Sequence, residues 1–235
     1  MNSSGSELLE TTEPIFRKEA EELRNKLCGM SLFELKKLWG CSDKLVEENF
    51  QKLNHPACLT PALLAYEGIQ YQYMAPQVFT QAQWDYCSEH LRILSGLYGV
   101  LRPTDGVLPY RLEMQAKLSG ENYRDLYGFW GDALYREIAG QGEWILNLAS
   151  REYSRTIEKY CISDVPFITC IFGELSDGKV KTKATLAKMA RGEMVRFLAE
   201  HQITSPEEIC RFTELGFVFD EKRSQKNQLV FIKSQ

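Results

Sequence analysis

Arginines and aromatic rings are concentrated between residues 91 and 132, which contain LSGLYGVLRPTDG, PYRLEM and DLYGFWGD. Guanidinium groups supply forked hydrogen-bond donors for phosphates, and flat rings stack on bases. This segment could therefore form a site for a phosphate-bearing ligand. The same composition also fits a buried aromatic core in which the arginines pair with Asp105, Glu113 and Asp125. Spacing alone leaves both interpretations open.

Acidic residues in the same segment suggest a second kind of chemistry. Asp132, Glu113 and Tyr110 are the candidate catalytic residues if the segment lines a closed pocket, where Arg102 and Arg111 would hold a nucleotide-like substrate. Such a mixture of charges is more often an ion-pair network, and the chain has no Walker A, GxGxxG or GxSxG motif. The sequence therefore favours a protein that is not an enzyme.

Two short helices are expected on either side of a tight turn within residues 31–54. Ser31 and Glu34 fit a capping box, and the first helix is expected to end at Gly40. The second helix is expected from about Lys44 to Leu53. The pair resembles a helix-hairpin-helix, in which turn amides and the second helix N-terminus bind phosphate. The candidate contacts are Lys36, Lys37, Gly40, Ser42 and Lys44. An ordinary helical hairpin with solvated lysines is the alternative.

The hydrophobic periodicity of the remaining chain predicts a mixed fold. Helices are expected over 13–27, 80–94 and 133–139, with another starting at Thr60-Pro61. Buried strands are expected over 144–149 and 165–172, followed by a hairpin turn at Asp177-Gly178-Lys179 and a closing hairpin of 216–219 with 229–232. The fold class is α+β (mixed α/β): a central β-sheet surrounded by helices, in a single domain of residues 1–235.

Two further places offer cations. Residues 179–196 contain six lysines and arginines against one acid, in a chain whose net charge is −4. Helical periodicity places Lys188 and Arg191 about 60° apart, opposite the apolar stripe, so both are expected to reach solvent or an anion. Arg151 follows a buried strand at a strand-to-helix corner, where open α/β sheets bind ligands.

Metal and redox chemistry receive little support. The seven cysteines are scattered without a CxxC pair, and the three histidines are far apart. The sequence predicts reduced, mostly buried thiols, no metal and no cofactor. No apolar run approaches the roughly 18–20 residues that span a bilayer, and no secretion signal is found. A cytoplasmic monomer without membrane contact is therefore expected.

Several motifs, in order, resemble the YaaA family of bacterial peroxide-stress proteins: LSGLYGVLRP, PYRLEM, FWGD, NLAS-x-EY and KMARG. The resemblance runs from about Gly29 to the C-terminus. It implies a role in the response to peroxide and an association with double-stranded DNA. Family members usually open with an apolar strand and a Ser-Pro-Ala-Lys turn, and neither is found here, so that strand is expected to be missing from the sheet.

The resulting hypothesis is a protein that binds double-stranded DNA, with junctions as a further target, and limits oxidative damage. The expected contacts are those of the helical hairpin together with Arg102, Tyr110, Arg111, Arg151, Lys188 and Arg191. Two alternatives stay open. One is the enzyme acting on a nucleotide-like substrate, and the other is an iron-handling or redox protein, which rests only on the peroxide link and the cysteines.

Overall fold

A computed structural model describes residues 10–55, 58–161 and 165–233. These residues belong to two compact units. The first comprises the chain up to Tyr66 together with residues 92–140 and 150–160. The second comprises residues 67–91, 141–149 and the chain from Cys161 onward. Helices and mixed sheets together confirm the predicted α+β class.

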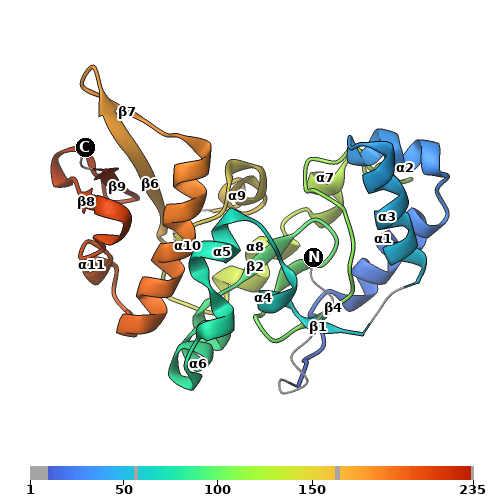
Figure 1. The fold of residues 1–235 in the computed structure, drawn as a ribbon, viewed down its shortest axis with the longest axis horizontal. Coiled ribbons are helices and arrows are strands. Elements are labelled where there is room, and N and C mark those ends of the chain that lie inside the picture. The colour runs from blue at the N-terminus through green and yellow to red at the C-terminus, as the bar shows by residue number, and fades with distance from the viewer. Residues whose placement is uncertain (1–9, 56–57, 162–164, 234–235) are drawn as a thin grey trace. The chain divides into compact units, whose positions relative to one another are not determined.

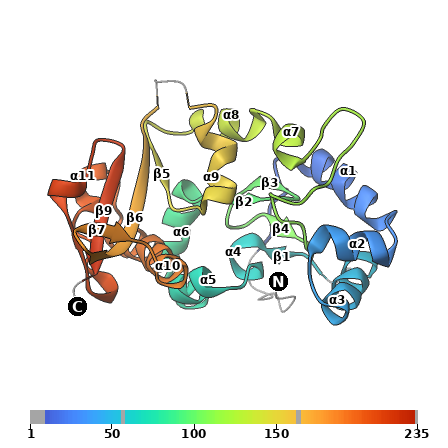
Figure 2. The ribbon, with the colours of Figure 1, turned by 90° about the horizontal axis from the view of Figure 1, so that it is seen from above.

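Three helices open the first unit: α1 (Arg17–Cys28), α2 (Leu32–Trp39) and α3 (Asp43–Asn54). The predicted capping box is present, because the Ser31 hydroxyl accepts from the Glu34 amide while the Glu34 carboxylate accepts from the Ser31 amide at 2.8 Å. Figure 2 shows α2 and α3 as neighbours, and both pack through leucines that are almost fully buried, Leu35 and Leu53.

The arginine- and aromatic-rich segment forms short strands and helices of the first unit. Strand β2 (Ile93–Ser95) pairs antiparallel with β3 (Gly99–Leu101), and β1 (Thr60–Pro61) pairs with β4 (Gly106–Val107). Helices α4 (Ala62–Ala65), α7 (Leu126–Trp130), α8 (Ala133–Ala139) and α9 (Arg151–Glu158) complete this unit.

Two sequence predictions fail in this region, for the same reason. Thr60-Pro61 does not begin a helix but forms a bridge to β4, and α4 starts one residue later. The helix expected over 80–94 ends at His90, because residues 93–95 pair with β3. In both places strand pairing overrides the local helical pattern.

Glycine is required at two positions of the β2–β3 hairpin. A Cβ on Gly96 would collide with the carbonyl oxygen of Leu112, and Gly99 has φ +71°. Gly99 also faces Trp130, whose ring carbons would lie 2.9 Å from an added Cβ. Both glycines therefore mark positions where the backbone approaches other residues closely.

The second unit is built on a sheet with strand order β5-β6-β9-β8. Strands β5 (Ile145–Asn147), β6 (Phe167–Ser176) and β9 (Gln228–Lys233) run parallel, while β8 (Phe217–Phe219) joins β9 as the predicted antiparallel hairpin. Helices α5 (Ile69–Met74), α6 (Gln81–His90) and α11 (Pro206–Ile209) also belong to this unit.

Helix α10 (Ala184–His201) covers one face of this sheet and lies alongside β6 (Figure 1). Fully buried rings fill the interface, namely Phe172, Phe212, Phe217 and Phe231. Another side of α10 packs against α5, where Gly192 meets the backbone of Gln70 and Met74 so closely that no Cβ could fit. The helix is thus held on two sides.

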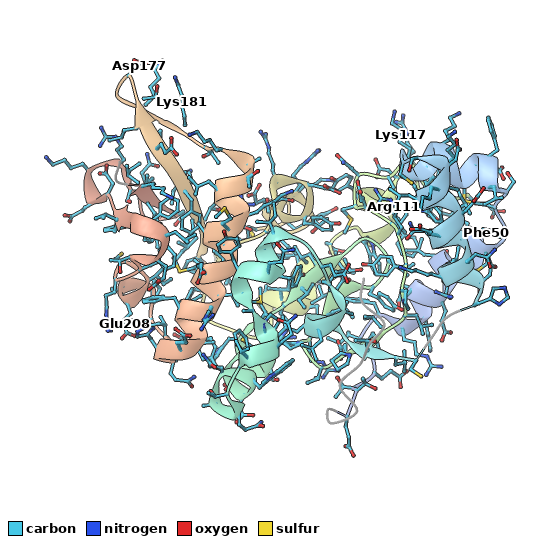
Figure 3. The ribbon with its side chains drawn as sticks, in the orientation of Figure 1. Phe50, Arg111, Lys117, Asp177, Lys181 and Glu208 are labelled. Carbon is cyan, nitrogen blue, oxygen red and sulfur yellow. The ribbon has the colours of Figure 1, made fainter. Side chains whose placement is uncertain are left out.

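Strands β6 and β7 (Lys179–Lys181) form an antiparallel hairpin through Asp177 (φ +54°) and Gly178 (φ +73°), as the sequence predicts. Lys181 pairs with Asp177 at 3.4 Å near the tip of this hairpin, where Figure 3 labels both side chains. Within the described ranges, no helix combines the length and apolarity that a membrane-spanning segment needs.

Candidate functional site

The turn between α2 and α3 is shaped by two residues that the sequence singled out. Gly40 adopts φ +55° and ends α2, with its amide donating to the carbonyl of Lys36 at 3.0 Å. Ser42 is the N-cap of α3, but its side chain makes no capping hydrogen bond. The first-turn amides of α3 have no intrahelical acceptor and are not capped, so they are available to an outside acceptor.

Three lysines flank this turn, and their surroundings differ. Lys44 is the most open, with a side chain 87% exposed and Glu48 only at 4.0 Å. Lys36 pairs with Asp43 at 2.5 Å. Lys37 is exposed and has no ion pair among the described residues. Residues 31–54 contain four lysines and four acidic residues, so any anion attraction is local to the turn.

A chain of hydroxyl groups lies beneath the aromatic segment in the first unit. The hydroxyl oxygens of Tyr66 and Tyr110 are 2.6 Å apart, and that of Tyr110 is 2.7 Å from the Ser95 oxygen. Ser95 already accepts the amides of Leu97 and Tyr98, at 3.2 and 2.8 Å. Ser95 therefore donates to Tyr110, and Tyr110 donates to Tyr66. Burial raises the pKa of Tyr110 well above its ordinary value, so its proton is retained.

The two central arginines are occupied by internal partners. Arg102 pairs with Asp105 at 3.1 Å, and Asp105 is completely buried. This carboxylate also accepts from the backbone amide of Arg102 and from the hydroxyl of Thr12, at 2.8 and 2.7 Å. Arg111 pairs with Glu113 at 3.1 Å, while its Nε is buried without a partner. Both guanidiniums would have to change partners to hold a phosphate.

The three candidate catalytic residues are not joined into one constellation. Asp132 pairs with Arg136 at 2.5 Å on the exposed side of α8. Glu113 pairs with Arg111, and Tyr110 belongs to the hydroxyl chain. Across the described part of the chain, no hydrogen bond or ion pair connects Asp132 with either of the other two.

Helix α9 begins at the predicted strand-to-helix corner, with Ser150 as N-cap and Arg151 exposed. The carboxylate of Glu152 accepts from the amide of Gln115 at 3.2 Å, and desolvation raises the pKa of Glu152. Desolvation likewise raises the pKa of Tyr153. Glu152 was not among the predicted site residues, because its contact with Gln115 spans a chain separation that no local pattern reveals.

On α10 Lys188 is open to solvent, whereas Arg191 is open only in part. Lys188 is exposed, as expected. Arg191 is half-buried, its Nε is sealed from solvent, and burial lowers the pKa of its guanidinium. Arg191 is less open than expected because α10 is covered twice, by the sheet and by α5.

Among the residues placed by the structure, no group of three or more histidine, cysteine, aspartate and glutamate side chains could hold a metal ion. Cys87 is buried and forms no disulfide, and burial raises the pKa of its thiol to about 12. The thiolate that peroxide chemistry requires is therefore disfavoured at Cys87.

These features define a mixed α+β protein with an exposed, lysine-flanked helical hairpin and an internally satisfied tyrosine cluster. The chain belongs to the peroxide stress protein YaaA family, whose model matches residues 1–223. Similar curated proteins carry the name UPF0246 protein. That of Lactiplantibacillus plantarum is 52% identical over 224 residues, 94% of this chain and 90% of the relative.

Two other relatives are similar in sequence over almost the same span. The UPF0246 protein of Lachnoclostridium phytofermentans is 49% identical over 226 residues, 95% of this chain and 89% of its own length. The UPF0246 protein DSY0297 of Desulfitobacterium hafniense is 48% identical over 237 residues, 100% of this chain and 94% of its own length. Family membership thus places the chain among peroxide-stress proteins, and the names of these relatives state no activity.

Proposed function

We propose that the protein binds double-stranded DNA in the cytoplasm during the response to peroxide, mainly without sequence preference, and so limits oxidative damage to the DNA. The observation that carries the proposal is the α2–α3 turn: Gly40 in a left-handed conformation, an uncapped α3 N-terminus and lysines on both sides. A phosphate placed at the turn would accept from the α3 amides while Lys37 and Lys44 neutralise its charge.

The geometry favours Lys37 and Lys44 over Lys36 as primary contacts. Lys36 is held by Asp43, which would have to be released before Lys36 could bind a phosphate. Of the two ion-paired lysines at the turn, Lys44 has the more exposed side chain. Lys37 forms no ion pair with any described residue, so it need not give up a partner to bind a phosphate. Exposed ion pairs are worth at most about 1 kcal/mol, so Lys36 can still join as a secondary contact.

The other candidate contacts divide in the same way. Lys188 and Arg151 are exposed and can meet a backbone phosphate directly. Arg102 and Arg111 must first leave Asp105 and Glu113, and Tyr110 is tied into the hydroxyl chain. Arg191 is half-buried, so we exclude it from the proposed duplex interface. Four-way junctions are proposed as a second substrate of the same surface.

The test is binding of a labelled duplex and a four-way junction across a salt series, by fluorescence anisotropy. The informative variant is Lys37→Ala/Lys44→Ala, and Lys52→Ala is the matched control because Lys52 lies in the last turn of α3. Each lost phosphate contact lowers the slope of log affinity against log salt by roughly 0.9, so the double variant should lose about 1.8. The control should keep the wild-type slope.

Two results would count against the proposal. Absence of any duplex binding by the wild-type protein at about 50 mM salt would remove DNA as the ligand. Binding that is equally strong and equally salt-dependent in the double variant would keep DNA but move the contact away from the α2–α3 turn.

A further inference from the structure

Arg191 differs from most of the arginines whose contacts are defined. Seven of them pair with a carboxylate at 3.3 Å or less, namely Arg17, Arg102, Arg111, Arg136, Arg196, Arg211 and Arg223. Arg191 has no ion pair and no hydrogen bond with any residue that the structure describes, although it is half-buried and its Nε is sealed from solvent. A partly buried guanidinium whose Nε–H has neither water nor an acceptor requires an explanation.

The position of Arg191 on α10 makes this charge more unusual. Ala190 is fully buried and belongs to the core between α10 and the sheet, whereas Gly192 packs against α5. Arg191 is about 100° from each of them around the helix and so lies on the side of α10 between the sheet and α5. The residues one turn before and after it, Ala187 and Val195, are 3% and 4% exposed.

The nearby groups do not neutralise the charge. Cys170 on β6 is the titratable group that interacts with Arg191, and burial raises the pKa of its thiol, so Cys170 is neutral at physiological pH. Ala187 and Val195 carry no polar side chain. Nothing described around Arg191 therefore offers an acceptor for its buried Nε–H.

We propose that Arg191 is the anchor of a binding site for a small oxyanion, a carboxylate or a phosphate, on the side of α10 that lies between the sheet and α5. A planar guanidinium presents its donors as a fork that matches two oxygens of either group. The apolar neighbours reduce solvent screening and strengthen the contact. The exposed cations proposed to contact DNA do not include Arg191, so this site is independent of that interface.

The experiment measures thermal unfolding of the intact protein in rising inorganic phosphate or acetate, against chloride at the same ionic strength. A ligand that binds only the folded state raises the unfolding midpoint with its concentration. Four proteins are compared: wild type, Arg191→Met, Arg191→Lys and the control Lys179→Met, which removes an exposed charge of β7 in the same unit. Phosphate and acetate are separate arms and identify which oxyanion is preferred.

We expect phosphate or acetate to raise the midpoint of wild type and Lys179→Met beyond the effect of chloride. Arg191→Met should bind at least about tenfold more weakly, because a charge-assisted bond is worth roughly 1.5–3 kcal/mol. Arg191→Lys keeps the charge but loses the fork and should be intermediate. Duplex binding and its salt slope should be unchanged in Arg191→Met, which separates this site from the DNA proposal.

A second readout does not depend on the folding of a variant. The Nε–H resonance of Arg191 in labelled wild-type protein, assigned by triple-resonance experiments, should shift on addition of phosphate or acetate and saturate. The inference is overturned if neither anion exceeds chloride in wild type, or if the midpoint of Arg191→Met responds as strongly as that of wild type. A resonance that does not move would overturn it as well.

Discussion

Gly192→Ala is a sharp test of the packing that holds α10 between α5 and the sheet. In a solvated helix this change would stabilise by roughly 1 kcal/mol through helix propensity. Here the new Cβ would lie 2.9 Å from the amide nitrogen of Met74, and closer still to the carbonyl oxygen of Gln70. Ordinary contact begins near 3.4 Å, so α5 must move by at least 0.5 Å.

Because both obstacles are backbone atoms, no side chain can rotate away to make room. Overpacking of this kind costs about 1–3 kcal/mol, which exceeds or cancels the propensity gain. We therefore expect a net loss of up to about 2 kcal/mol, or roughly 2–4 °C in unfolding midpoint for each kcal/mol, measured by circular dichroism. The control is Gly142→Ala in the same unit, where the nearest atom is 3.7 Å from the new Cβ. A Gly192→Ala protein more stable than wild type would refute the described contact of α10 with α5.

Three further predictions concern the first unit and the β8–β9 hairpin. Asp105→Asn should destabilise the protein by about 2–3 kcal/mol in urea unfolding. This loss is below the range for fully buried ion pairs because the Arg102 side chain is 38% exposed. The control Asp132→Asn removes an exposed ion pair and should cost less than about 1 kcal/mol. Tyr110→Phe should cost about 1–2 kcal/mol because it removes the middle hydroxyl of the chain, and an unchanged denaturation midpoint would count against the hydrogen bonds described. The hydrogen bond from Arg223 lowers the pKa of Asp220 below 3.8, so its stabilising effect is present above that pH and is lost as the pH falls through the folded-state pKa. Asp220→Asn should accordingly unfold earlier than wild type at neutral pH and at the same midpoint in strong acid.

Local signals predicted the elements that local chemistry determines. The Ser31–Glu34 capping box, the end of α2 at Gly40 and the turn at Asp177-Gly178 were all predicted from a few neighbouring residues. Each feature is closed by hydrogen bonds or by a backbone conformation within four residues. The same is true of the β8–β9 hairpin, whose two apolar runs are separated by one polar loop.

What the sequence did not reveal depends on partners far along the chain. Tyr66 and Tyr110 share a hydrogen bond across 44 residues, and the complete burial of Asp105 follows from its contacts with Thr12, 93 residues away. The apolar stripe of α10 was recognised, but the second cover on its other side by α5 was not, and this cover accounts for the burial of Arg191. A helical pattern reports which side is apolar, and it does not report how many neighbours the helix has.

The central claim is that duplex DNA contacts the turn between α2 and α3. The most direct measurement is the change in backbone amide resonances when a short duplex is added to ¹⁵N-labelled protein. The account predicts that the largest shifts occur from Gly40 to Val46, at the end of α2 and the first turn of α3, and that they diminish as salt is raised. Shifts confined to other elements, with residues 40–46 unaffected at saturating duplex, would contradict it.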